Sequence, residues 1–194
     1  MMGWKKSLGA ALLSMACVQA WATTLSVTPT PAVTTQGSTI SVAVNLSDVI
    51  DLSTYQFSLS YDQRMLHFTG YTAGGFLSSG GAMTDEFYSF ETPNSISFVT
   101  GIAFGGASVS GSGTLAYFTF DTVAAGYSGL TLSDVLLLNT NGGDIATTIG
   151  NSAVTVQVPT GDVPEPASWM LIGAGLVAAG ALRRRRVSAS AAMA

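Results

Sequence analysis

The sequence predicts an all-β domain of the sandwich or jelly-roll type between residues 23 and 158. Apolar and polar residues alternate there in several short stretches, which is the pattern of strands with one buried face. Clusters of Gly, Asn, Ser and Asp separate these stretches, and such clusters form turns. No part of this region has the long 3.6-residue period of an amphipathic helix. Many short strands joined by glycine-rich turns favour two packed sheets.

Each expected strand is defined by the residues that share one face. In chain order these sets are Ile40, Val42, Val44 and Leu46; Tyr55, Phe57, Leu59 and Tyr61; Ile96 and Phe98; and Ala116, Phe118 and Phe120, opposite Leu115, Tyr117 and Thr119. Residues 154–156 supply a closing strand. The expected turns lie at 74–75, 78–81, 105–106, 110–113 and 139–143. A single core in a region of this size buries about two-thirds of the unfolded surface, which is enough for folding.

Residues 1–22 have the three parts of a secretory signal peptide. Lys5 and Lys6 are the positive region, residues 8–18 are the apolar region, and Ala20 and Ala22 give the small-residue pattern before a cleavage site. The apolar region is too short for a spanning helix, which argues against an uncleaved anchor. The chain's one cysteine lies in this segment, so the mature domain is expected to have no disulfide.

The exported region is strongly acidic. Residues 23–163 contain ten Asp and Glu residues and a single base, Arg64, for a net charge of −9. A surface with this charge repels phosphate backbones and anionic lipids. The composition therefore excludes nucleic acid as a partner.

The C-terminal part of the chain has the features of a membrane-inserted segment. Residues 159–166 read as a linker, residues 167–182 are uncharged, and residues 183–194 begin with four arginines. An uncharged stretch of this kind can form a transmembrane helix, and the positive-inside rule keeps the arginines cytoplasmic. We therefore expect a membrane helix over 167–182 with a basic cytoplasmic tail over 183–194.

The segment contains Val163, Pro164, Glu165 and Pro166, then the apolar stretch 167–182, then Arg183, Arg184, Arg185 and Arg186. This order resembles the PEP-CTERM sorting signal of Gram-negative bacteria. The resemblance implies export by the secretion machinery, an inner-membrane intermediate, and cleavage near the motif by a membrane-embedded exosortase. It also implies delivery to the cell envelope, the cell surface or the extracellular matrix.

The central region contains, in order, the segments 36–46, 55–62 closed by 65–68, 111–120, 129–132 and 153–156. This order of motifs resembles a cohesin domain. The resemblance implies a nine-strand jelly-roll sandwich, related to carbohydrate-binding modules, that binds a dockerin. Thr54 and Gln56 stand where the dockerin-contacting strand of the better-known cohesins carries an Asn and an Asp.

Few residues of the domain suggest chemistry. His67 is the single histidine and is expected on a strand, and a catalytic or metal role would need partners that the sequence lacks. Asp85 and Glu86 would point to opposite faces of a strand, so they suit an exposed acidic turn better than a glycosidase pair. We expect no catalytic residue, no cofactor and no enzyme activity.

Two loops could bind ions, and for both the structural interpretation is simpler. Asp48 and Asp51, together with residues 139–144, offer oxygen ligands for calcium, but the spacing is not that of an EF-hand and Asn-Gly is first a turn signal. The glycines of 101–113 do not follow a strand and open a helix, so they favour a surface loop over a phosphate site. No metal site is expected.

Flat aromatic faces suit sugar rings, and eight aromatic residues could include such a platform. They are Tyr55, Tyr61, Tyr71, Tyr88, Tyr117, Tyr127, Phe76 and Phe87. Alternation places several of them in the core. A carbohydrate-binding module would need solvent-facing rings in line on one sheet.

The expected function is that of a non-enzymatic, exported binding or scaffold module of the cell surface or extracellular matrix, with a protein or polysaccharide ligand. The alternative is a carbohydrate-binding module that acts on exopolysaccharide or plant-type polysaccharide. A hydrolase would need a cleft with convergent carboxylates, for which the sequence offers little.

Overall fold

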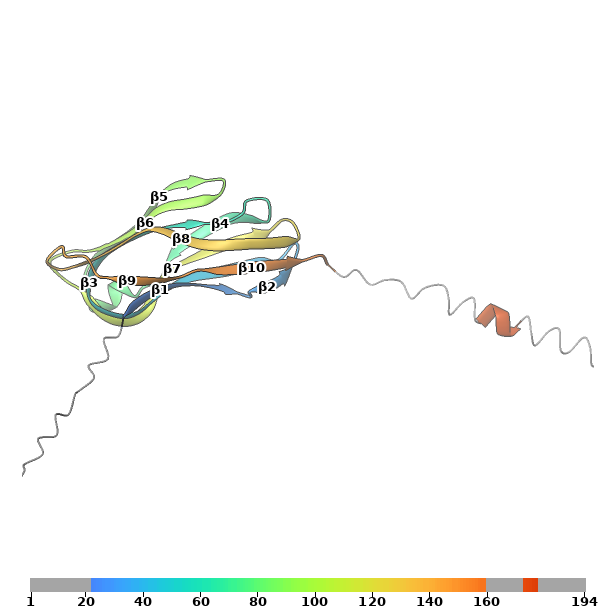
Figure 1. The fold of residues 1–194 in the computed structure, drawn as a ribbon, viewed down its shortest axis with the longest axis horizontal. Coiled ribbons are helices and arrows are strands. Elements are labelled where there is room, and N and C mark those ends of the chain that lie inside the picture. Colours follow the sequence, from blue (N-terminus) through green and yellow to red (C-terminus); the bar gives the residue numbers. More distant parts are fainter. Residues whose placement is uncertain (1–21, 160–172, 178–194) are drawn as a thin grey trace, which may run out of the picture. The chain divides into compact units, whose positions relative to one another are not determined.

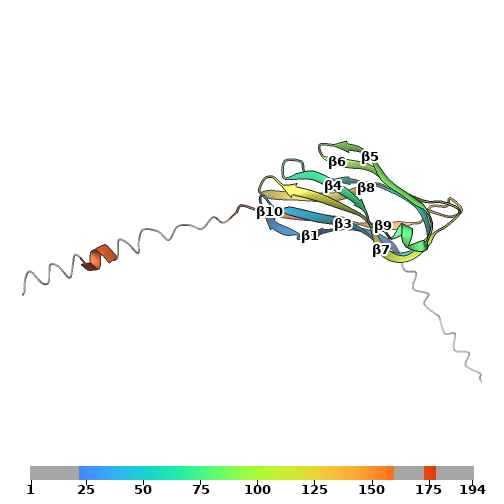
Figure 2. The same cartoon turned by 180° about the vertical axis from the view of Figure 1, so that it is seen from behind.

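A computed structural model describes residues 22–159 and 173–177, and the first range forms two layers of strands (Figures 1 and 2). The strands are β1 (Thr23–Thr30), β2 (Val33–Thr35), β3 (Thr39–Ser60), β4 (Leu66–Ala73), β5 (Thr84–Thr92), β6 (Ser95–Ala103), β7 (Val109–Thr122), β8 (Gly126–Asn139), β9 (Thr147–Gly150) and β10 (Ser152–Gln157), with one 3₁₀ helix, η1 (Leu77–Gly80). The all-β sandwich predicted from the alternation is confirmed.

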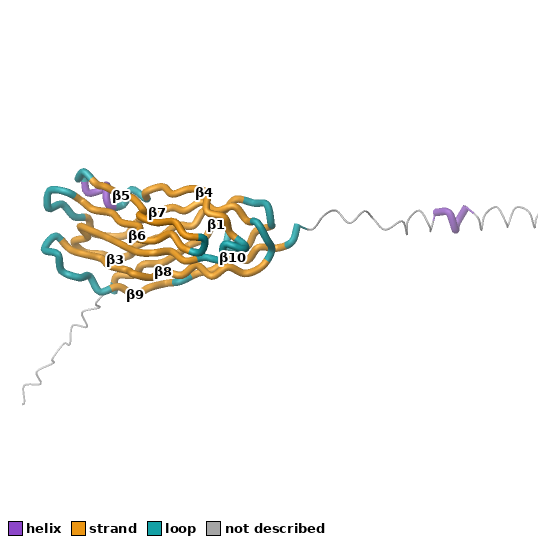
Figure 3. Tube along the Cα trace, turned by 90° about the horizontal axis from the view of Figure 1, so that it is seen from above, coloured by secondary structure: helices purple, strands orange, loops and turns teal. Residues whose placement is uncertain are grey.

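The two layers share the long strand β3. Its first half pairs with β1 and β7, which gives a layer in the order β4–β7–β3–β1–β9. Its second half pairs with β6 and β8, which gives a layer in the order β5–β6–β3–β8–β10–β2. Seen from above in Figure 3, the loops gather at the two ends of the strands. Side chains presented on the outer face of either layer are therefore available for binding.

The alternation predicted two strands, over 40–46 and 55–61, where the structure has one. Asp48 and Asp51 adopt positive φ angles of 56° and 60°, which bend β3 without ending it. Their backbone N–H groups donate to the hydroxyls of Ser112 and Ser110 on β7, at 3.0 and 2.9 Å. Aspartate tolerates the left-handed region better than most residues, so the chain passes between layers at these two positions.

The core lies between the layers, and every residue of it falls between Leu25 and Val156. The largest fully buried rings are Tyr55, Phe57, Phe118 and Phe120. Phe57 meets Phe118 edge to face, with ring centroids 6.3 Å apart. Burial of each such ring contributes roughly 1.5–3 kcal/mol relative to exposure. These are the residues that the period-2 pattern placed on buried faces.

One predicted face is wrong. Ile96 and Phe98 were expected to share a face, but Ile96 is fully buried and Phe98 is 39% exposed. The register between β3 and β6 shifts by one residue between Phe57 and Leu59, and Phe98 has a φ of 52°. A bulge of this kind inserts one residue and turns its side chain out of the alternation.

The chain divides into two units, Met1–Gln157 and Val158–Ala194. In the second unit residues 173–177 are helical. Within the described residues, no helix is both long and apolar enough to cross a membrane. The predicted signal peptide up to position 21, the sorting motif Val163–Pro166 and the arginines 183–186 lie outside the described residues, as does most of the predicted membrane helix 167–182.

Candidate functional site

One row of side chains crosses the outer face of the layer β5–β6–β3–β8. Phe87 on β5 pairs with Thr100 on β6, Thr100 pairs with Gln56 on β3, and Gln56 pairs with Leu136 on β8. Directly paired residues project from the same face of a sheet, so the four side chains form a line. The ends of the row, Phe87 and Leu136, are exposed, and its centre is polar.

The bulge at Phe98 adds aromatic surface next to this row. The ring of Phe98 contacts that of Phe90 edge to face, with centroids 6.3 Å apart, and Phe90 is 61% exposed. The backbone N–H of Phe98 donates to the Ser58 hydroxyl at 3.2 Å, which fixes the bulge to β3. We call Phe87, Phe90 and Phe98 the hairpin patch. Sequence alternation missed Phe98 because it assigned that ring to the core.

The carboxylates of Asp85 and Glu86 do not form the exposed acidic turn that was expected. Both lie on β5, where they point to opposite faces. Asp85 is exposed, whereas Glu86 is half-buried and accepts a hydrogen bond of 2.8 Å from the Tyr55 hydroxyl. The turn was a wrong prediction because the paired edge strand continues through both residues. Opposite faces also exclude them as a glycosidase pair.

The predicted aromatic platform is divided between core and surface. Tyr55, Tyr61 and Phe76 are buried, and Tyr71 packs against the core. Burial raises the pKa of the Tyr71 hydroxyl to about 12. The exposed members are Phe87 and Tyr88 on β5, Tyr117 on β7 and Tyr127 on β8. Tyr117 lies on the layer that contains β7 and the other three rings lie on the layer that contains β5 and β8, so the four rings do not form the line on one sheet that a flat sugar platform needs.

The remaining candidates are an exposed histidine and a loop held by hydrogen bonds. His67 lies exposed on β4, the strand position expected for it. Asp51 accepts a 2.9 Å hydrogen bond from the Thr140 hydroxyl, and Asn139 Oδ1 accepts from the backbone N–H groups of Asn141 and Gly143. The loop 139–144 is thus a turn with its own side-chain cap. Within residues 22–159 and 173–177, no three His, Cys, Asp or Glu side chains are grouped to hold a metal.

The glycine-rich stretch 101–113 is a surface loop only over residues 104–108, and the turn expected at 110–113 is wrong because those residues belong to β7. The stretch ends β6, turns through Gly105 and Gly106 with φ angles of 76° and 73°, and enters β7. Since no helix begins there, it cannot offer a helix N-terminus to a phosphate.

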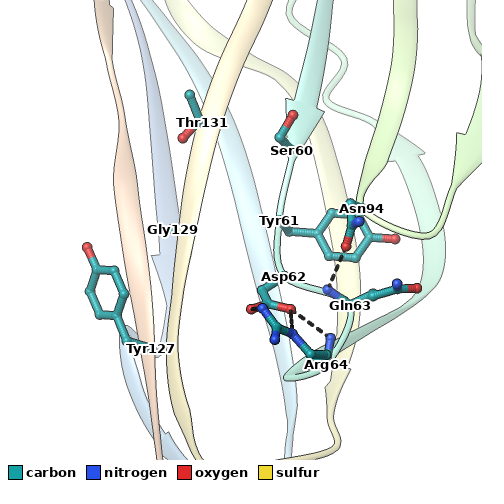
Figure 4. A pocket seen from close by; sticks show the side chains of 9 residues that line it. All are labelled: Ser60, Tyr61, Asp62, Gln63, Arg64, Asn94, Tyr127, Gly129 and Thr131. Atoms are coloured by element: carbon teal, nitrogen blue, oxygen red, sulfur yellow. Dashed lines mark hydrogen bonds and ion pairs between the residues drawn. The ribbon is translucent and has the colours of Figure 1, made fainter.

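A second surface lies at the end of the same layer at which β3 ends and β8 begins. An open groove of about 670 Å³ runs between β8 and the turn after β3 (Figure 4). Its lining residues are Ser60, Tyr61, Asp62, Gln63, Arg64, Asn94, Tyr127, Gly129 and Thr131. The Arg64 guanidinium donates two hydrogen bonds of 3.2 Å to the Asp62 carboxylate. Hydrogen bonds from Arg64 hold the pKa of the Asp62 carboxyl below its ordinary value. The bond from the backbone N–H has the largest effect, and the bond from the guanidinium comes next.

Comparison with known families identifies both regions of the chain. The model of the cohesin domain matches residues 24–158. The model of the PEP-CTERM protein-sorting motif matches residues 162–186. A search of curated proteins finds no match.

Solved structures show the same fold. A non-cellulosomal cohesin from the archaeon Archaeoglobus fulgidus is 23% identical and has a TM-score of 0.59, with 71% of this chain and 92% of that chain covered. The sixth cohesin of scaffoldin B from Acetivibrio cellulolyticus, solved in complex with a Cel5 dockerin mutant, is 18% identical with a TM-score of 0.59. The match covers 71% of this chain and 100% of that chain. CaCohA2 from Clostridium acetobutylicum is 21% identical with a TM-score of 0.53, and the match covers 69% of this chain and 91% of that chain.

Proposed function

Because the match over residues 24–158 makes this chain a member of the cohesin-domain family, we propose that it is a non-enzymatic protein-binding module of the bacterial cell surface. The binding surface is the outer face of β5–β6–β3–β8. The observation that carries the proposal is the row Phe87–Thr100–Gln56–Leu136 with the hairpin patch beside it. Protein interfaces join exposed aromatic anchors to a polar surround in this way.

The chemistry of this face indicates the kind of partner. Asp85 and Asp134 are exposed on its strands, and the region 23–163 has a net charge of −9. A partner with an apolar centre and a basic rim would complement it. A dockerin-type domain is one such partner, and some solved cohesins are described in complex with dockerins. Thr54 and Gln56 offer uncharged contacts on β3.

The sorting motif supports a route to the surface. The match over 162–186 contains Val163–Pro166, the apolar stretch and Arg183–Arg186. Export by the secretion machinery after cleavage behind Ala22, insertion through 167–182 and processing by an exosortase would deliver the domain to the envelope or extracellular matrix of a Gram-negative bacterium. The domain would then work outside the cell, with its outer sheet face free.

The protein-binding function is tested by photo-crosslinking in the native host. A photoreactive phenylalanine analogue replaces Gln56 or Phe98, and the matched control carries it at Tyr117, which is exposed on the other layer. Positions 56 and 98 should crosslink to the same protein, and position 117 should not. For that partner, Phe98→Ala should weaken binding by about tenfold or more, as loss of an aromatic anchor does. Equal crosslinking at all three positions would reject this face as the interface.

The polysaccharide alternative is weaker at this face. The row contains one ring, Phe87, and the other two rings of the hairpin patch, Phe90 and Phe98, meet edge to face and do not lie flat in one line. A sheet-face platform for a sugar chain would present several rings in line. The outer face of β5–β6–β3–β8 therefore favours a protein ligand.

A further inference from the structure

The groove beside the start of β8 differs chemically from the sheet face. Its walls are β8 on one side and, on the other, the turns that follow β3 and β5 (Figure 4). The backbone N–H of Asp62 donates to the Ser128 hydroxyl at 3.0 Å, and that of Tyr61 donates to the Asn94 carbonyl at 2.9 Å. These bonds hold the three segments together before any ligand arrives. A site with fixed walls loses less free energy to ordering when it binds.

Gly129 keeps the floor of the groove open. It lies on β8 between Tyr127 and Thr131, which share its face of the strand. A Cβ atom added at Gly129 would meet nothing within 4 Å, and its φ lies outside the left-handed region. Neither crowding nor backbone conformation therefore requires a glycine in this strand. The close approach of a ligand or of another backbone is one of the reasons for a glycine inside a strand.

The lining is polar and has little net charge, which suits a neutral ligand rich in hydroxyl groups. Arg64, the single base of residues 23–163, is already paired with Asp62, so the groove has little net charge of its own. Gln63 and Asn94 are exposed and offer amide donors and acceptors, and the ring of Tyr127 is 66% exposed. The acidic domain around the groove repels polyanions. An apolar helix would find few apolar side chains to cover.

We propose that this groove is a saccharide-binding site for a neutral polysaccharide. The ring of Tyr127 stacks against one pyranose, the chain passes over Gly129, and the side chains of Gln63, Asn94 and Arg64 hydrogen-bond its hydroxyls. This activity goes beyond protein binding and does not depend on it. Ser60 in the groove is four residues from Gln56 along β3, a separation of about 13 Å at strand spacing, so the two surfaces can be changed separately.

The test is isothermal titration of the full chain in a polyoxyethylene detergent, whose headgroup contains no sugar. The probes are a soluble β-glucan, xyloglucan, galactomannan, dextran and neutral polysaccharide extracted from the native host, with alginate as the polyanion. At least one neutral probe should bind, and alginate should not. Tyr127→Ala and Gly129→Val should each weaken binding by about tenfold or more, a loss comparable to that of one good contact.

Matched variants separate this site from a general change in fold. Valine suits a strand better than glycine, so Gly129→Val should fold at least as stably as the parent chain. Tyr117→Ala removes an exposed tyrosine from the other layer and should leave sugar binding unchanged, as should Phe98→Ala at the protein-binding face. The proposal is overturned if no neutral probe binds, if alginate binds best, or if both groove variants bind as the parent does. Binding of a peptide library in place of the sugars would also overturn it.

Discussion

The hydroxyl of Tyr55 on β3 donates a 2.8 Å hydrogen bond to Glu86 Oε2, and this bond joins β3 to β5, the edge strand of the same layer. The same hydroxyl lies 3.2 Å from the carbonyl of Leu115 on β7. Burial is the main cause that raises the pKa of Tyr55 far above its ordinary value, and Tyr71 and Glu86 add to it. Tyr55 therefore remains a donor at any physiological pH, and it anchors the strand that presents Phe87.

Removal of this donor should loosen the edge of the layer. Tyr55→Phe keeps the ring and leaves the half-buried Glu86 carboxylate without its tyrosine partner. We expect the free energy of unfolding to fall by about 1–3 kcal/mol, measured by urea denaturation. Hydrogen exchange should rise first in β5, because the lost bond holds that strand. Glu86→Gln keeps an acceptor oxygen and should cost less than Tyr55→Phe; the reverse order would show that the bond is not what holds β5.

Gly101 leaves room for the Tyr55 ring to pack against β6. A Cβ atom at Gly101 would stand 2.2 Å from Tyr55 Cε1, which is far inside van der Waals contact. Gly101→Ala should therefore force the ring or the strand to move and cost about 1–3 kcal/mol of unfolding free energy. The matched control is Gly129→Ala, where the added methyl group meets open space. Equal stability of the two variants would contradict the packing described for Gly101.

Stability should fall in acid, and Asp51 should contribute to the fall. Hydrogen bonds from the hydroxyls of Ser108 and then Thr140 hold the pKa of Asp51 below its ordinary value. A carboxyl group with a lower pKa in the folded chain stabilises the fold above its unfolded pKa, and this contribution is lost as the pH falls through the folded value. We expect urea midpoints to drop between pH 7 and pH 3, and to drop less in Asp51→Asn. Asparagine tolerates the positive φ at this position. An identical drop in parent and variant would exclude Asp51 as a contributor.

The sorting motif predicts a change in size and location of the protein. Replacement of Pro164, Glu165 and Pro166 by alanine should leave the chain uncut and in the membrane fraction of the native host. The parent chain should begin near Thr23, end near the motif and leave that fraction. Intact-mass spectrometry of both fractions measures this difference. Release of the triple variant at the parent's mass would show that processing does not use the motif.

Local pattern was enough for most of the fold. The sets Ile40–Leu46, Tyr55–Tyr61 and Ala116–Phe120 were placed on buried faces by alternation alone, and the core contains them. The face of Phe98 was predicted wrongly because the bulge at this residue depends on the register of β6 against β3. The alternation within β6 does not contain that information. Asp85 and Glu86 were assigned to a turn for a similar reason: the ladder between β5 and β6 extends a strand through residues with low strand propensity.

By itself, the sequence determined the all-β class, the buried faces of most strands, the acidic charge of the domain and its single base, and the resemblance to a sorting signal. These properties are local, since each depends on the order and type of neighbouring residues. Only the tertiary structure decided that Gln56 stands in a row with Phe87 and Leu136, that Glu86 meets Tyr55, and that Gly129 opens a groove beside Arg64. Those relationships join residues from different strands, and strand register and sheet packing, which are non-local, bring them together.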